Sequence, residues 1–182
     1  MKMLVHRVST VEAPPFDLAT IKTHMRISFD DHDDVINNIG HAAAAEIEHF
    51  AQVAFLTQII RVTIFDPALT SGLRLPVGPV AEDATITVTI DGEAFTGFAF
   101  AGGNRPYINW KRPWFDLNPT RVNIEYQAGF GATHEAIPHD LAQALMDQAA
   151  LHYDGRSPMS AKELTMSPHM ARIGARYRGV SA

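Results

Sequence analysis

Leu75-Pro-Val-Gly-Pro-Val80 and Tyr126-Gln-Ala-Gly-Phe-Gly131 enclose the middle of this chain, and a helical pattern lies on each side of them. Proline fixes φ and removes a donor from a strand ladder, whereas glycine permits a positive φ. Both stretches therefore mark where strands begin and end. Their position between helical segments predicts an α+β fold in which a β-rich part is inserted into a helical body.

The composition is that of an ordinary globular domain, with 182 residues of which 46% are hydrophobic and 19% charged. The absence of cysteine excludes disulfides, thiolate catalysis and thiolate metal sites. No apolar run has the length of a signal peptide or approaches the ~20 residues of a membrane helix. We therefore expect a soluble, intracellular protein.

Charge is distributed unevenly along the chain. Residues 1–155 carry ten basic and nineteen acidic side chains, whereas residues 156–182 carry five basic side chains and one acidic side chain. An acidic body with a basic end is a hint about binding partners and says nothing about the fold.

Three segments have the apolar spacing of amphipathic helices, namely residues 17–26, 33–53 and 138–154. Aspartates at the start of the second segment are expected to cap its first turn and to face the positive end of its dipole. Pro138 suits the first turn of the third segment, and Gly155 is expected to end it.

The part between these helices, residues 57–127, is rich in β-branched residues and in turn signals. Ala84-Thr-Ile-Thr-Val-Thr-Ile90 alternates threonine with isoleucine or valine, which is the strongest strand pattern of the chain. Asp91-Gly92 predicts a hairpin turn, with residues 95–100 as the return strand. Together with residues 57–65, 73–76, 105–110 and 121–126, these segments predict a small, mostly antiparallel sheet. We expect residues 1–155 to form one domain and residues 156–182 to form a flexible basic tail.

A search for catalytic or metal-binding chemistry finds no positive signal. The cluster Asp30–Asp34 lacks the glycine and the distal glutamate of a calcium loop. No histidine pair has the i, i+4 spacing of a helical zinc site. His134, Glu135, His139 and Asp140 are close in sequence and could gather at a helix start, but without matching spacing we expect ordinary surface or core histidines. Nucleophile elbows, phosphate loops and dinucleotide fingerprints are absent. The sequence therefore predicts a protein that is not an enzyme and has no catalytic residue, metal or cofactor.

The segment Trp110-Lys-Arg-Pro-Trp-Phe115 interleaves basic and aromatic residues. Such a loop can cover the end of a sheet, contribute to a protein interface, or stack the bases of a single-stranded nucleic acid. The acidic body disfavours the nucleic acid. We regard Trp110, Lys111, Arg112 and Trp114 as a candidate interface loop.

The end of the chain, residues 169–177, has a weak helical pattern in which apolar and cationic residues alternate. Met170, Ile173 and Tyr177 have the spacing of one helix face. Two interpretations stay open: a solvated, disordered end, or a segment that becomes ordered on a partner.

Taken together, six pieces resemble the head–tail connector, or adaptor, proteins of tailed bacteriophages and of their prophage and gene-transfer-agent relatives. They span nearly the whole chain in the order of that family. The pieces are Asp17–Arg26, the Asp-rich start and Ala-rich body of the next helix through Glu48, Leu75-Pro-x-x-Pro-Val80, Tyr126-x-Ala-Gly-Phe130, Ile137-Pro-x-x-Leu141 and the end near Tyr177-Arg178.

This resemblance implies a structural protein of the particle neck that is assembled in the bacterial cytoplasm. About twelve subunits would form a ring between the portal protein and a tail-completion (stopper) protein and would extend the DNA channel, although a lone subunit can be monomeric. DNA would pass through without specific binding, and no membrane would be involved. The C-terminal segment would dock on the portal through Met170, Arg172, Ile173, Arg176, Tyr177 and Arg178.

One alternative function comes from the residues themselves. The Trp110–Trp114 loop and the basic tail could form a nucleic-acid-binding accessory module with steep salt dependence.

Overall fold

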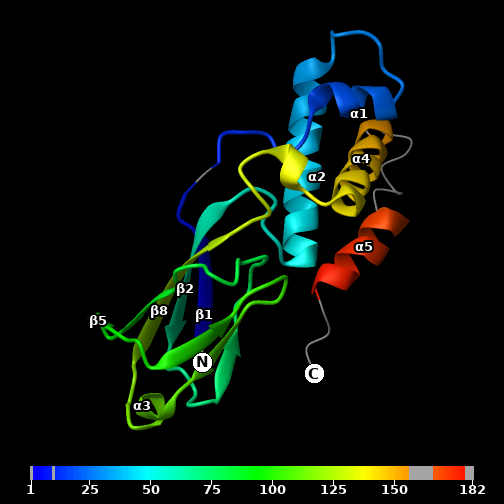
Figure 1. Ribbon diagram of the computed structural model, residues 1–182. Coiled ribbons are helices and arrows are strands. Elements are labelled where there is room, and N and C mark those ends of the chain that lie inside the picture. The colour runs from blue at the N-terminus through cyan, green and yellow to red at the C-terminus, as the bar shows by residue number, and fades with distance from the viewer. Residues whose placement is uncertain (1, 10, 156–165, 179–182) are drawn as a thin grey trace. The chain divides into compact units, whose positions relative to one another are not determined.

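The computed structural model describes residues 2–9, 11–155 and 166–178, and the chain forms two compact units. Residues 1–11 and 57–129 make up the first, which we call the β unit. Residues 12–56 and 130–182 make up the second, which we call the helical unit. The strands lie in the first unit and the long helices in the second, so the predicted α+β class is confirmed (Figure 1).

The larger sheet of the β unit has five antiparallel strands in the order β1-β2-β8-β4-β5. Its central pair is β2 (Gln58–Phe65) and β8 (Arg121–Ala128), which are in register over their full length. Alternate residues of β2 are buried, as expected for a sheet with one covered face. The remaining strands are β1 (Lys2–Arg7), β4 (Thr87–Ile90) and β5 (Glu93–Ala94).

A smaller sheet has the order β3-β7-β6, with β3 (Gly72–Arg74), β7 (Tyr107–Trp110) and β6 (Phe98–Ala101). The single predicted sheet is thus two sheets. The buried apolar residues of the β unit come from both sheets and the loops between them: Ile60, Val62, Ile64, Leu75, Val77, Val80, Val88, Ile90, Ile108, Trp110, Trp114, Val122, Ile124 and Tyr126.

The two stretches that enclose the β-rich part are in direct contact. The Gly129 N–H donates to the Pro79 carbonyl at 2.9 Å, and the Val77 N–H donates to the Tyr126 hydroxyl at 3.3 Å. Burial raises the pKa of Tyr126 above its usual value. These bonds connect the loop after β3 to the end of β8. The two stretches that mark strand ends in the sequence therefore also form a tertiary contact.

The hairpin after β4 has the predicted turn, since Asp91 and Gly92 adopt φ values of 51° and 98°. The predicted return strand over residues 95–100 is wrong. After the turn, the two residues of β5 return along β4, whereas β6 pairs with β7 in the other sheet. The reason is that Phe95 and Phe98 turn away to pack against the ring of Trp110.

In the helical unit, α1 (Leu18–His24), α4 (His139–Asp154) and α5 (Pro168–Arg178) contact α2 (Asp33–Ala51), and Figure 1 shows them around it. A 3-10 turn, His134–Ala136, precedes α4. The three helices predicted before residue 155 are therefore present within a few residues of their predicted bounds. Their shared core includes Ile21, Ile36, Ala43, Ile47, Leu141, Leu145 and Ala149.

The acidic start of α2 differs from the prediction in one respect. The N-cap residue is His32, and it makes no side-chain cap bond, although Asp33 and Asp34 do lie in the first turn. Lys22 donates to Asp30 and Asp33 at 2.6 Å each. The hydrogen bond between Lys22 and Asp30 lowers the pKa of Asp30 and raises that of Lys22. Lys22 of α1 therefore balances part of the negative charge of this cluster, and among the described residues the cluster is not arranged to hold a metal ion.

The predicted helix at residues 169–177 is confirmed as α5. Within the predicted tail, this part is neither solvated nor waiting for a partner in order to become a helix, because it packs on α2 and α4 of its own unit. Residues 156–165 and 179–182 of the predicted tail lie outside the described residues. The boundary at residue 155 stays a prediction.

Candidate functional site

The site that carries the predicted portal contacts is α5 and the surface on which it lies. Met170 and Ile173, one turn apart, are only 2% and 4% exposed, and Tyr177 is half-buried. Gly174 allows a close approach, because a Cβ there would lie 2.5 Å from a ring carbon of Phe50. The apolar stripe read from the sequence is thus buried against the protein's own core.

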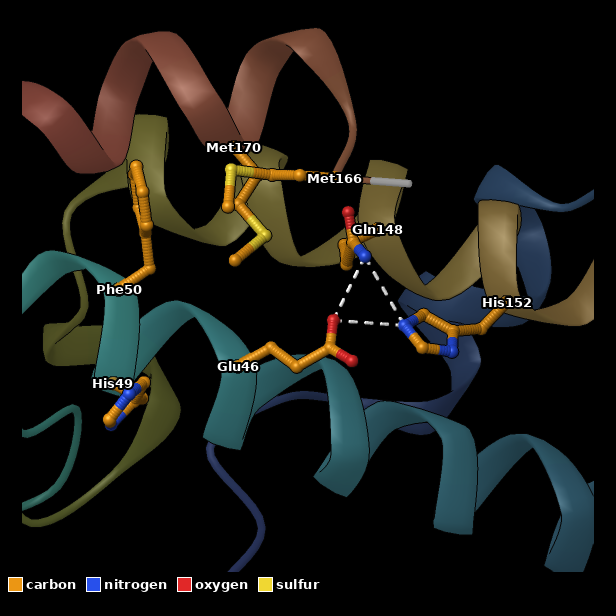
Figure 2. Close-up of a pocket in the computed structure, with 7 residues that line it drawn as sticks. All are labelled: Glu46, His49, Phe50, Gln148, His152, Met166 and Met170. Carbon is orange, nitrogen blue, oxygen red and sulfur yellow. Dashed lines mark hydrogen bonds and ion pairs between the residues drawn. The ribbon is translucent and has the colours of Figure 1, made fainter. Parts of the chain in front are cut away.

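A chain of polar contacts holds the N-terminal end of α5. The Ser167 hydroxyl accepts from the Met170 N–H at 3.1 Å, in the manner of an N-cap. The Ser167 N–H donates to Gln148 Oε1 at 2.8 Å. Figure 2 shows the next step, in which Gln148 Nε2 and His152 Nε2 both lie 2.9 Å from Glu46 Oε2. Side chains of α4 and α2 thereby fix where α5 begins.

A pocket of about 310 Å³ lies beside this network (Figure 2). One side carries the converging polar groups of Glu46, Gln148 and His152, and the other carries Met166, Met170 and Phe50. Methionine and phenylalanine give that side an apolar, deformable lining. The surface beneath α5 is therefore not completely filled by α5 itself.

A second polar contact lies on the Asp147 carboxylate of α4. Its Oδ2 forms a hydrogen bond with Nδ1 of His169 on α5. Its Oδ1 lies 3.1 Å from Nε2 of His24 on α1. Gln143 donates to the same carboxylate at 2.9 Å. One carboxylate thus connects α1, α4 and α5.

The C-terminal end of α5 is held by Tyr177, whose hydroxyl donates to Asp140 Oδ1 at 3.0 Å. Burial, together with this bond, raises the pKa of Tyr177 to about 12. The Tyr177 ring meets Phe130 edge-on, and the guanidinium of Arg178 lies 5.7 Å from the centre of the Phe50 ring.

The predicted portal residues therefore fall into two groups. Met170, Ile173 and Tyr177 hold α5 to its own unit, whereas Arg172, Arg176 and Arg178 are exposed. The side of α5 open to a partner is the cationic one.

The predicted interface loop is a short helix, α3 (Arg112–Phe115). Trp110 and Trp114 stack with ring centres 4.5 Å apart, and they are 6% and 1% exposed. The two tryptophans cover the sheet and are not available to stack on bases or to enter an interface. Their neighbours Lys111 and Arg112 are exposed.

Among the described residues no cluster of histidine and carboxylate side chains could hold a metal ion. His134 and Glu135 lie in the 3-10 turn, and His139 and Asp140 begin α4. In the same part of the chain, no helix combines the length and apolarity needed to cross a membrane.

Sequence reasoning missed the Glu46–Gln148–His152 network. A signal for it was present, because Gln148 and His152 lie on the face of the third predicted helix that also carries Leu141 and Leu145. Polar residues on a core-facing stripe need partners when buried.

Comparison with known proteins gives a consistent result. Residues 16–88 match the family model described as phage gp6-like head-tail connector protein. No curated protein matches the chain.

Three solved structures share the fold over 98% of this chain and 97% of theirs. The first belongs to the virion of a native gene transfer agent particle (26% identity, TM-score 0.78). The second belongs to the neck of an empty particle computed with C6 symmetry (24%, 0.76). The third belongs to the neck of a native particle computed with C12 symmetry (23%, 0.73).

The family match covers α1, α2, β2 and β3, and the fold shared with the solved structures includes the rest of the chain nearly completely. The resemblance read from the sequence is thereby confirmed. Over residues 16–88 this chain is similar to the phage gp6-like head–tail connector proteins, and over nearly its whole length it shares the fold of gene transfer agent particle proteins.

Proposed function

We propose that this connector forms a ring of about twelve subunits in the neck of a phage-like particle, between the portal and a tail-completion protein. The observation that supports it most directly is the fold shared along nearly the whole chain with components of gene transfer agent particles, two of them necks solved with C6 and C12 symmetry. A symmetric ring needs only copies of one subunit with two complementary surfaces.

The portal side of the ring is assigned to α5. With α5 on its own unit, Arg172, Arg176 and Arg178 make the contact, while Met170, Ile173 and Tyr177 position the helix that carries them. Arginine is well suited to acidic or carbonyl-rich surfaces because its planar head donates several hydrogen bonds. The exposed Lys111 and Arg112 of the β unit are the candidates for a contact with the tail-completion protein.

The wall of the DNA channel is assigned to acidic parts of the helical unit. Residues 12–56 carry eight acidic and two basic side chains. Negative charge repels DNA phosphates, so the duplex would slide without being held. Exchange of these carboxylates for amides, followed by unchanged DNA passage, would remove this part of the proposal.

The test is co-expression of the full chain with the portal protein of the same particle, followed by affinity purification and electron microscopy. We expect a ring of connector on the portal. Reversal of Arg172, Arg176 and Arg178 to glutamate should weaken binding at least tenfold, whereas reversal of Lys111 and Arg112 should leave it unchanged. Absence of any complex with the wild-type chain would refute the proposal.

The alternative of a nucleic-acid-binding module is disfavoured because Trp110 and Trp114 are buried and cannot stack on bases. A gel-shift titration at low salt should show no complex between the chain and single-stranded or duplex DNA.

A further inference from the structure

The five-stranded sheet of the β unit ends in two unlike edges. One edge is β1, which has six residues, and the other is β4 with the two-residue β5 beside it. An edge strand presents backbone N–H and C=O groups that can pair with another chain. Both edges are therefore possible surfaces for assembly.

The outer side of β1 is open. The Val8 N–H donates to the Ile59 carbonyl at 2.8 Å, and antiparallel alternation then directs the backbone groups of Met3 and Val5 away from β2. In the part of the chain that the structure describes, β2 is the only strand paired with β1. Leu4 and Val5 are 39% and 43% exposed, so the edge is also apolar.

The opposite edge has an unused stretch of strand sequence. The alternating pattern begins at Ala84, yet pairing with β8 begins only at Thr87. On the outer side, the last bond along β4 runs from the Phe95 N–H to the Val88 carbonyl, at 2.9 Å. Within the described residues, Thr85 and Ile86 thus belong to no strand, although their sequence favours one.

Charge distinguishes the two edges. Lys2 and Arg7 lie on β1, whereas Glu82, Asp83 and Glu93 lie at or beside the β4–β5 edge. Two β1 strands would bring like charges together, but β1 and the β4 edge bring unlike charges together. The charges therefore favour contact between different edges of two copies.

We propose that β1 of one copy pairs with residues 84–87 of the next copy, so that the sheet continues from subunit to subunit around the ring. This inference rests on the proposed function, because it requires the connector to assemble with itself. A contact between two different patches, repeated with a closing rotation, produces a ring rather than an isolated dimer.

Val5→Pro is the first test, with Val5→Thr as its matched control. Proline removes the N–H that points away from β2, so the β1–β2 ladder keeps its bonds. We expect Val5→Pro to unfold at a temperature close to that of the wild type but to give fewer than a tenth of the rings on co-expressed portal. Val5→Thr should assemble normally. A folded Val5→Pro variant that forms rings at the wild-type yield overturns the inference.

Cysteine cross-linking is the second test and decides the matter if Val5→Pro does not fold. The chain has no cysteine, so introduced pairs report without background. Leu4 lies on the same face of the sheet as Thr87, so Leu4→Cys combined with Thr85→Cys or Thr87→Cys should give, on oxidation of the portal complex, a ladder at multiples of 20.0 kDa. Leu4→Cys combined with Ala99→Cys, on the exposed side of β6, should give none.

The outcomes separate the two proposals. Rings on the portal without a ladder from either pair overturn the edge contact and leave the proposed function intact. A wild-type chain that forms no ring overturns both.

Discussion

The short helices α3 and α5 are attached to their units by different kinds of contact. In the β unit, α3 is attached by apolar packing, since Trp114 stacks on Trp110 and is almost completely buried. In the helical unit, α5 is held by polar contacts at both ends and lies beside a pocket of about 310 Å³. Apolar burial of a large side chain gives high local stability, whereas a short helix that is attached through one apolar face and a few hydrogen bonds beside a pocket can open separately. We therefore expect α3 to open only when the β unit unfolds, and α5 to open separately from the rest of the helical unit.

The largest effect is expected at Trp114, the largest of the fully buried side chains among the described residues. Trp114→Ala should cost about 3–5 kcal/mol of the free energy of unfolding of the β unit, because it removes a stacked indole and leaves a cavity. Phe115→Ala, at a 45% exposed neighbour, should cost much less. Urea unfolding followed by circular dichroism measures both. Equal losses of unfolding free energy for the two variants would show that the buried Trp114 does not attach α3 to the β unit.

Ile173→Ala should have the next largest effect, about 2–4 kcal/mol, because a fully buried side chain of α5 is truncated. The loss should appear as faster hydrogen exchange in residues 168–178, with α2 and the β unit unchanged. Arg172→Ala, on the exposed side of the same helix, is the control. If exchange also rises throughout α2, then α5 is an inseparable part of the core and the comparison fails.

Removal of the amide that receives the start of α5 should have a smaller effect. Gln148→Ala leaves the buried Ser167 N–H without its acceptor, for an expected cost of about 1–3 kcal/mol. His152→Ala, which leaves the Gln148–Ser167 bond in place, should cost less. Amide exchange at residues 167–170 distinguishes the two variants, and a larger effect of His152→Ala would place the main bond elsewhere.

Much of this architecture follows from sequence pattern, and the failures have physical reasons. The helices at residues 17–26, 33–53 and 138–154 are predicted because their apolar spacing is regular. β1 is missed because Lys2, His6 and Arg7 interrupt its apolar pattern, and its open edge leaves most of its side chains exposed. The return strand was misplaced because propensity cannot show that Phe95 packs against Trp110, a long-range contact.

The candidate site was predicted in a similar way. The spacing of Met170, Ile173 and Tyr177 identifies a helix with one apolar face, but spacing alone cannot show whether that face meets a partner or the chain's own core. The structure gives the second answer, since the face lies on α2 and α4. The acceptors on these helices, Gln148 and Asp140, are unremarkable in sequence and gain meaning only from their position.

The smallest expected effect concerns Tyr177 and depends on pH. Its pKa is raised to about 12 from the ordinary value of about 10, because the neutral hydroxyl is partly buried and donates to Asp140. The contribution of this group to holding α5 is complete below about pH 10 and is lost as the pH rises towards 12, since the unfolded form ionises first.

Tyr177→Phe should remove this dependence, with a cost of about 0.5–1.5 kcal/mol at neutral pH for the lost hydrogen bond. Subtraction of its ultraviolet titration at 295 nm from that of the wild type isolates one phenol, whose ionisation should centre near pH 12. A difference curve centred near pH 10 would mean that the hydroxyl is already in water. In that case the C-terminal end of α5 would be unattached, and only the Ser167 end would distinguish the helix from a free one.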